Sequence, residues 1–170
     1  MTPFLESNNA MFAGHKPLYE VEELTKPLAI PKPKNAVAVI RNPVDRIISC
    51  ANYFKTNDFH DHKYGSIEDV NELSYLLMNE PMGTDEMFPF LPQVHYLKGS
   101  LPIKLFLFDR INEVFSHLDL PVRHDNKSKR YYHKENMLES TLIDINNHYA
   151  EDLKLYERCK NTNNGFTRIR

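Results

Sequence analysis

The sequence predicts an α/β protein with a mainly parallel sheet, because short apolar segments alternate with stretches of helical periodicity. The run Ala-Val-Ala-Val-Ile at 36–40 is continuous and β-branched, as expected for a strand buried on both faces. A second apolar run, Ile-Lys-Leu-Phe-Leu-Phe, occupies residues 103–108. Strands that alternate with helices favour a layered fold in which helices cover a parallel sheet.

The other elements follow from periodicity and from turn residues. Residues 10–15 predict a short strand ending at Gly14, and Ser66 is a candidate helix cap with Asp69 three residues later. Prolines and polar residues predict irregular connections around residues 27–33, 57–66, 81–92 and 123–134. The expected helices cover residues 17–27, about 43–56, a segment containing Leu73 and Leu77, 111–118 and about 138–158.

Composition restricts the class of protein. A chain of 170 residues with 41% apolar residues fits one domain over residues 1–170, with a frayed polar tail at 160–170. The net charge of −2 argues against a nucleic-acid partner. Cys50 and Cys159 form no disulfide framework, and no segment resembles a membrane span or a signal peptide. We therefore expect a soluble, cytoplasmic protein with no membrane partner.

The most informative segment directly follows the strand at 36–40. It reads Arg-Asn-Pro-Val-Asp-Arg-Ile-Ile-Ser from Arg41 to Ser49, and Pro43 sits where a helix can begin. Arg41 is thus expected at the carboxyl end of a buried strand, the edge where open α/β sheets bind ligands. An arginine fork and a hydroxyl group that converge there suit a phosphate. The alternative is an ordinary helix start at which Arg46 and Ser49 are solvated or paired.

A strand followed by R-x-P-x-x-R-x-x-S resembles the 3′-phosphate-binding motif of sulfotransferases that use 3′-phosphoadenosine 5′-phosphosulfate. The resemblance implies that Arg41 and Ser49 bind the 3′-phosphate of this nucleotide, and that a nucleotide sulfate donor is the cofactor. Further segments match the carbohydrate-modifying members of the family in the same order. They are Phe12-Ala-Gly-His15, Phe88-Pro-Phe-Leu-Pro-Gln-Val-His-Tyr-Leu97, Leu107-Phe-Asp-Arg-Ile111, Asn126-Lys-Ser128 and His148-Tyr-Ala-Glu-Asp-Leu-Lys-Leu-Tyr156.

The resemblance implies a P-loop-NTPase-like three-layer sulfotransferase fold and transfer of sulfate to a hydroxyl acceptor, most readily a saccharide. His15 is the candidate catalytic base, because a histidine after glycine has this role in the matching strand of heparan and dermatan 2-O-sulfotransferases. The alternative is a structural histidine. Lys127, Ser128 and Arg130 correspond to a late basic loop that closes over the 3′-phosphate. A solvated charged turn is the alternative for that loop.

One family feature has no counterpart in this sequence. The family begins with a strand and a Lys-x-Gly-Thr/Ser loop that binds the 5′-phosphosulfate, whereas none of the five glycines here lies in such a context. The expectation is an N-terminally truncated sulfotransferase fold. A truncated gene, a misassigned start, a rebuilt sheet or a second chain in a homodimer remain open. We predict that strands 10–15, 36–40 and 103–108 do not form the family's complete five-stranded sheet in a monomer.

Three further residue groups have competing interpretations. His60-Asp61-His62 lacks a third or fourth ligand at convincing spacing, so no metal is expected. Gln93 and His95 either border the ligand site or pack within a helix, and Tyr131-Tyr132 either stack on a base or cover a core edge.

The rival functions are a non-catalytic nucleotide- or partner-binding protein of the same fold and a P-loop kinase-like relative. The absent Gly-Lys-Ser/Thr loop argues against the kinase-like alternative.

Overall fold

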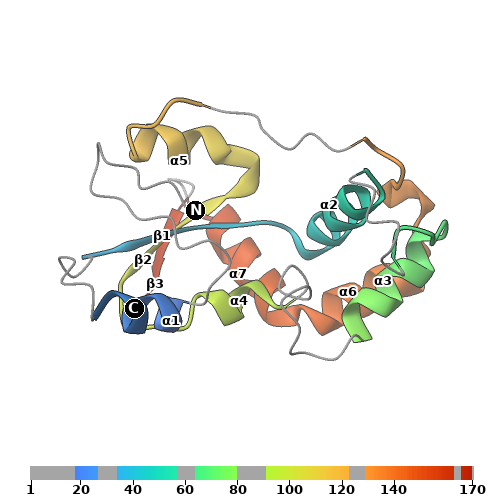
Figure 1. Ribbon diagram of the computed structural model, residues 1–170, viewed down its shortest axis with the longest axis horizontal. Coiled ribbons are helices and arrows are strands. Elements are labelled where there is room, and N and C mark those ends of the chain that lie inside the picture. The colour runs from blue at the N-terminus through green and yellow to red at the C-terminus, as the bar shows by residue number, and fades with distance from the viewer. Residues whose placement is uncertain are drawn as a thin grey trace. The chain divides into compact units, whose positions relative to one another are not determined.

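The protein has a mixed, mostly helical α/β structure (Figure 1). The computed structural model describes residues 18–26, 34–56, 64–79, 91–122, 129–162 and 166–169. The chain forms two compact units. The sheet unit comprises residues 1–40, 92–123 and 155–170, and the helical unit comprises residues 41–91 and 124–154.

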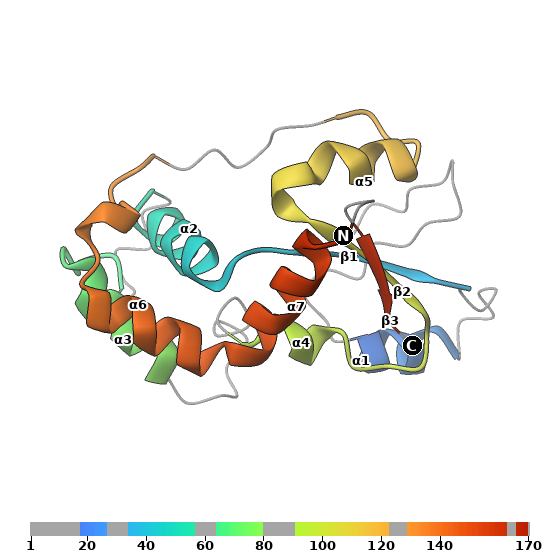
Figure 2. The same cartoon turned by 180° about the vertical axis from the view of Figure 1, so that it is seen from behind.

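The sheet unit contains three strands in the order β1-β2-β3. Strand β1 (Ala36–Ile40) runs parallel to β2 (Ile103–Leu107), and β3 (Phe166–Ile169) runs antiparallel along the other edge of β2. Figures 1 and 2 show the three strands side by side from opposite directions. The strands predicted at 36–40 and 103–108 are therefore confirmed. The predicted strand at 10–15 lies outside the described residues.

Two expectations about this sheet need correction. The tail expected to be frayed contains β3, in which Thr167 is the register partner of Leu105, because the edge of β2 offers partners for the N–H and C=O groups of this strand. The sheet is consequently mixed, with one parallel pair and one antiparallel pair. Strand β1 pairs directly with β2 through all five residues, so no strand stands between them.

The core of the sheet unit lies on one face of β2. Alternate strand residues Ile103, Leu105 and Leu107 pack with Tyr156 and Cys159 of helix α7 (Ala150–Lys160). Further elements of this unit are α1 (Leu18–Thr25), α4 (Gln93–Tyr96), η3 (Phe108–Arg110) and α5 (Ile111–His117). On the opposite face of β2, the ring of Phe106 contacts that of His117 of α5, with 5.4 Å between ring centroids.

The helical unit contains α2 (Pro43–Thr56), α3 (Val70–Asn79), η4 (Lys134–Asn136) and α6 (Glu139–His148). The apolar stripe predicted for α2 is buried, since Val44, Ile47 and Ala51 belong to the unit's core. The other core residues come from the remaining helices and their connections: Tyr64, Val70, Leu73, Leu77, Tyr132, Met137, Ile145 and Tyr149.

Two helix boundaries differ from the expectation. The cap of α3 is Asp69 rather than Ser66, because Asp69 Oδ1 accepts the N–H of Asn71 at 2.9 Å. The helix expected over 138–158 is divided at the buried Tyr149, which ends α6 with φ −106° and ψ 34°. Hydrogen bonding nevertheless continues across this residue, from Tyr149 N–H to Ile145 O and from Leu153 N–H to Tyr149 O, each at 2.9 Å.

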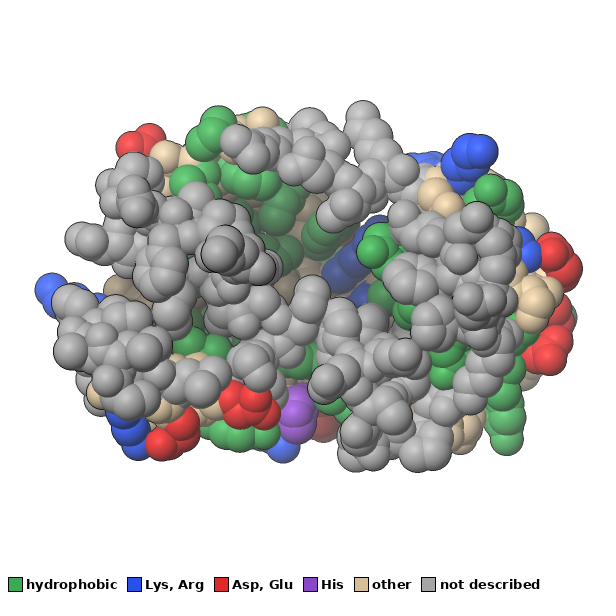
Figure 3. All heavy atoms as spheres, viewed as in Figure 1, with side chains coloured by type: hydrophobic (Ala, Val, Ile, Leu, Met, Phe, Trp, Pro, Cys, Tyr) green, Lys and Arg blue, Asp and Glu red, His purple; other side chains and the backbone are tan. Residues whose placement is uncertain are grey.

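The surface and the helix lengths bear on possible partners. Basic and acidic side chains are both visible among the described residues of the face in Figure 3, in keeping with the net charge of −2. Within the described part of the chain, no helix is long and apolar enough to cross a membrane.

Candidate functional site

The start of α2 is built by the residue that precedes its proline. Asn42 Oδ1 accepts the N–H of Val44 at 3.0 Å and that of Asp45 at 3.4 Å, and its backbone carbonyl accepts the N–H of Arg46 at 2.9 Å. Asn42 is thus the helix cap, and Pro43 contributes a fixed φ but no donor. Because Asn42 occupies these N–H groups, an anion bound here depends on side chains rather than on the helix terminus.

Arg41 and Ser49 lie at either end of the predicted phosphate motif, and both are half-buried. Cys50, the residue after Ser49 in α2, is influenced by both arginines of the motif. Burial raises the pKa of the Cys50 thiol, while the positive charges of Arg46 and Arg41 act in the opposite direction. The charges of both arginines therefore act on the turn of α2 that carries Ser49 and Cys50. We call Arg41, Arg46, Ser49 and Cys50 the α2 corner.

Arg46 has partners on two sides. Its Nη1 atom lies 3.4 Å from Oδ2 of Asp152, and its Nη2 atom donates to the carbonyl of Leu91 at 2.5 Å. The guanidinium carbon lies 5.8 Å from the centroid of the Tyr149 ring. The second arginine of the motif is therefore an ion-paired residue, which is one of the alternatives that the sequence left open.

The basic segment reaches α2 through a buried asparagine. Asn52 Oδ1 accepts the N–H groups of Tyr131 at 2.6 Å and Tyr132 at 2.9 Å, and Asn52 Nδ2 donates to Tyr132 O at 3.0 Å. Lys129 N–H donates to Thr56 Oγ1 at 3.0 Å. These bonds attach the backbone on both sides of the exposed Arg130 to α2. Asn52 lies one turn beyond Ser49 in that helix. Lys127 and Ser128 fall outside the described residues.

The two tyrosines of this segment have different environments. Tyr132 is buried, and its hydroxyl group donates to the carbonyl of Ile67. Burial also raises the pKa of Tyr132. Tyr131 is 46% exposed, next to Arg130. The core-edge interpretation therefore describes Tyr132, and of the two only Tyr131 presents its ring to solvent.

The remaining predicted residues divide into those described and those not. His15 and the segment His60-Asp61-His62 lie outside the described residues, so their roles stay predictions. In the described ranges, no group of three or more His, Cys, Asp or Glu residues is placed to hold a metal ion. The His95 ring meets that of Tyr19 edge-on at 6.5 Å, which supports the packing interpretation for α4.

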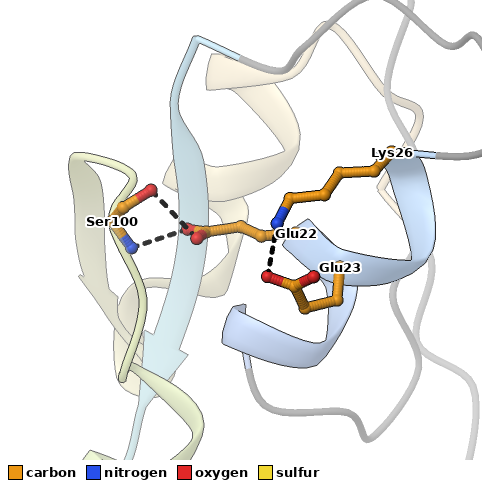
Figure 4. Close-up of polar contacts among 4 residues, drawn as sticks. All are labelled: Glu22, Glu23, Lys26 and Ser100. Carbon is orange, nitrogen blue, oxygen red and sulfur yellow. Dashed lines mark hydrogen bonds and ion pairs between the residues drawn. The ribbon is translucent and has the colours of Figure 1, made fainter.

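Sequence reasoning missed the polar residues that hold these segments in place. Asn42 was recognisable from the Asn-Pro pair before a helix, whereas Asn52 carries no local signal because its partners lie about 80 residues away. In the sheet unit, Glu22 accepts hydrogen bonds from Ser100 N–H at 2.7 Å and Ser100 Oγ at 2.9 Å (Figure 4). Glu22 thereby ties α1 to the loop before β2.

Comparison with known proteins adds no relative. No family model, no curated protein and no solved structure matches this chain. A function for the chain therefore rests on the residues of its own site.

Proposed function

We propose that this protein is a sulfotransferase that uses 3′-phosphoadenosine 5′-phosphosulfate and has the three-layer, P-loop-NTPase-like fold of that family. Arg41 and Ser49 bind the 3′-phosphate, and Arg130, with Lys127 and Ser128, closes over it. His15 is the base for a hydroxyl acceptor, most readily a saccharide.

The observation that carries this proposal is the succession β1, Arg41, α2. Arg41 directly follows a strand in parallel pairing, and its positive charge acts on the thiol of Cys50, the residue after Ser49 in α2. A guanidinium and a hydroxyl group in this arrangement suit the oxygens of a phosphomonoester. The attachment of residues 129–132 to α2 supports a role for the basic segment at the same helix.

The proposed reaction is an in-line displacement at sulfur. The acceptor oxygen forms a bond to sulfur while the bond between sulfur and the bridging oxygen of the 5′-phosphate breaks. His15 takes the proton of the acceptor hydroxyl, and the electron pair of the broken bond leaves with adenosine 3′,5′-bisphosphate. The products are a sulfate ester and the bisphosphate, so no oxidant or metal is consumed.

A second candidate is a nucleotide- or partner-binding protein of the same fold without transferase activity. The observation that favours it is the direct pairing of β1 with β2, because the family's phosphate-loop strand is normally central in the sheet. A nucleotide-binding protein requires 3′-phosphate binding at the α2 corner just as the transferase does, but only the transferase requires transfer. An assay with labelled sulfate donor and a panel of saccharides distinguishes them. Binding without transfer to any saccharide supports the second candidate.

Titration calorimetry with adenosine 3′,5′-bisphosphate and with adenosine 5′-monophosphate tests the site itself. We expect tighter binding of the bisphosphate, and we expect Arg41→Ala to remove about 1.5–3 kcal/mol of that preference, as for a charge-assisted hydrogen bond. Arg158→Ala, which removes an exposed arginine of α7, is the matched control and should leave both affinities unchanged. Equal affinity of the wild-type protein for the two nucleotides contradicts the proposal.

A further inference from the structure

Arg46 of the α2 corner forms a buried ion pair with Asp152, and the proposed chemistry does not use this pair. The carboxylate of Asp152 is fully buried, and the Arg46 side chain is only 13% exposed. Burying a carboxylate is costly unless a cation and hydrogen bonds compensate it. An isolated pair of this kind is weak evidence for stability, so its position relative to the phosphate site is the more informative property.

The planar fork of Arg46 is what allows one side chain to hold two partners. Nη1 faces Asp152 in the first turn of α7, and Nη2 bonds to the carbonyl of Leu91 at 2.5 Å. Tyr149 covers the guanidinium with its ring at 5.8 Å. A lysine has the same charge but, as a point charge, cannot make both contacts in this geometry.

In the sequence, Arg46 lies between the two proposed phosphate ligands, Arg41 and Ser49. It follows Arg41 by five residues, and it precedes Ser49 by three, which places Arg46 and Ser49 on neighbouring turns of one helix face. The backbone N–H of Arg46 is also the one that bonds to Asn42 O, so Arg46 belongs to the capped first turn. Movement of Arg46 therefore moves the turn that sets the spacing of Arg41 and Ser49.

We propose that Asp152 is a positioning residue for phosphate binding, acting through Arg46. Asp152 fixes the Arg46 fork, and this holds the first two turns of α2 so that Arg41 and Ser49 keep the spacing required by one phosphate. It also neutralises Arg46, so the 3′-phosphate binds at Arg41 and not at Arg46. This inference rests on the proposed function.

The test is the ratio of the two dissociation constants, for adenosine 5′-monophosphate and for adenosine 3′,5′-bisphosphate, in the full chain. Asp152→Asn keeps the shape of the side chain but removes its charge. We expect the ratio to fall at least about tenfold, as when a supporting partner of a charged ligand is removed. Glu151→Gln is the matched control, because its carboxylate lies one residue away in an exposed pair with Lys154 and should leave the ratio unchanged.

Arg46→Lys provides a second variant in case Asp152→Asn does not fold. It keeps the buried charge pair while losing the two-pronged contact, and the same fall in the ratio is expected. A purely structural role for the pair lowers the melting temperature and leaves the ratio at its wild-type value, which overturns the inference. A rise in bisphosphate affinity on Asp152→Asn also overturns it, because Arg46 is then itself a phosphate ligand. If the wild-type ratio is one, the proposed function fails instead.

Discussion

The two units of this molecule differ in the bonds that stabilise each of them internally. In the sheet unit, backbone pairing joins β1, β2 and β3, and the packed side chains of its core cluster are apolar apart from the hydroxyl of Tyr156. In the helical unit, side chains reach distant backbone groups. Among the described residues, the three buried polar or charged side chains, Asn52, Ser74 and Asp152, all belong to the helical unit.

The difference follows from how each unit satisfies its backbone. Strands pair their N–H and C=O groups with each other, so a sheet needs little help from side chains. The segment from 129 to 138 has only a short 3₁₀ turn, and its backbone groups must find partners elsewhere. Asn52 supplies them at Tyr131 and Tyr132, and Asn71 Oδ1 accepts the N–H of Leu138 at 2.8 Å.

Asn52→Ala is expected to have the largest effect, because Asn52 is buried and bonds α2 to the segment at residues 131–132. The substitution removes four hydrogen bonds, and it takes their side-chain partner from the buried backbone groups of Tyr132 and from the partly buried N–H of Tyr131. We expect the free energy of unfolding to fall by about 3–4 kcal/mol. Urea unfolding followed by circular dichroism measures this loss.

Asn79→Ala is the control for that substitution. Asn79 Nδ2 bonds to the carbonyl four residues earlier, Tyr75 O, at 2.7 Å, just as Asn52 bonds to Ile48 O, but Asn79 is exposed. Its loss should cost no more than about 0.5 kcal/mol. If both substitutions cost the same, the bonds from Asn52 to residues 131 and 132 do not hold the unit together.

Gly99→Ala is the corresponding test in the sheet unit, at a position where the backbone is closely packed against α1. A Cβ atom at residue 99 would lie 2.7 Å from Leu18 Cγ and 2.8 Å from Glu22 Oε1. The same Glu22 oxygen accepts the N–H groups of Ser100 and Leu101 at 2.7 and 2.9 Å, so the added methyl group displaces this contact. We expect a loss of about 1–3 kcal/mol in urea unfolding.

A double-mutant cycle separates crowding from backbone effects at this position. Leu18→Ala makes room beside residue 99, so Gly99→Ala should cost less in the Leu18→Ala background than alone. Additive losses would show that steric contact with Leu18 is not the cause.

These contrasts explain which features of the fold were predictable. The strands at 36–40 and 103–107 and the helix at 43–56 were visible because their signals are local runs and periodicities. The strand at 166–169 was missed because its signal is the second edge of β2 rather than its own short, mixed sequence. The break at Tyr149 was missed because hydrogen bonding crosses it without a proline or glycine.

In the candidate site, too, the features with a local sequence signal were predictable and those that depend on long-range contacts were not. The motif located Arg41 and Ser49 on a strand end and a helix, since strand, proline and helix follow each other in sequence. The roles of Arg46 and Asp152 depend on a contact between residues 106 positions apart, which no local pattern encodes. The fold that brings them together thus determines which arginine of the motif is held in a buried ion pair.

The smallest expected effect is a pH dependence in the sheet unit, at His117 of α5. Burial and, secondarily, the charge of Lys104 lower the pKa of His117 below its usual value of 6.5, and Lys104 Nζ lies 3.3 Å from His117 Nδ1. Lys104 can donate only to the neutral imidazole, so the folded state favours that form. The stabilisation is complete above pH 6.5 and is lost as the pH falls through the lowered pKa. Because His117 is exposed, we expect the free energy of unfolding to fall by well under about 1 kcal/mol.

Urea unfolding of the wild type and of His117→Gln, measured above pH 6.5 and below the lowered pKa of His117, isolates the contribution as the difference between their pH profiles. Parallel profiles for the two proteins would show that His117 contributes no pH dependence.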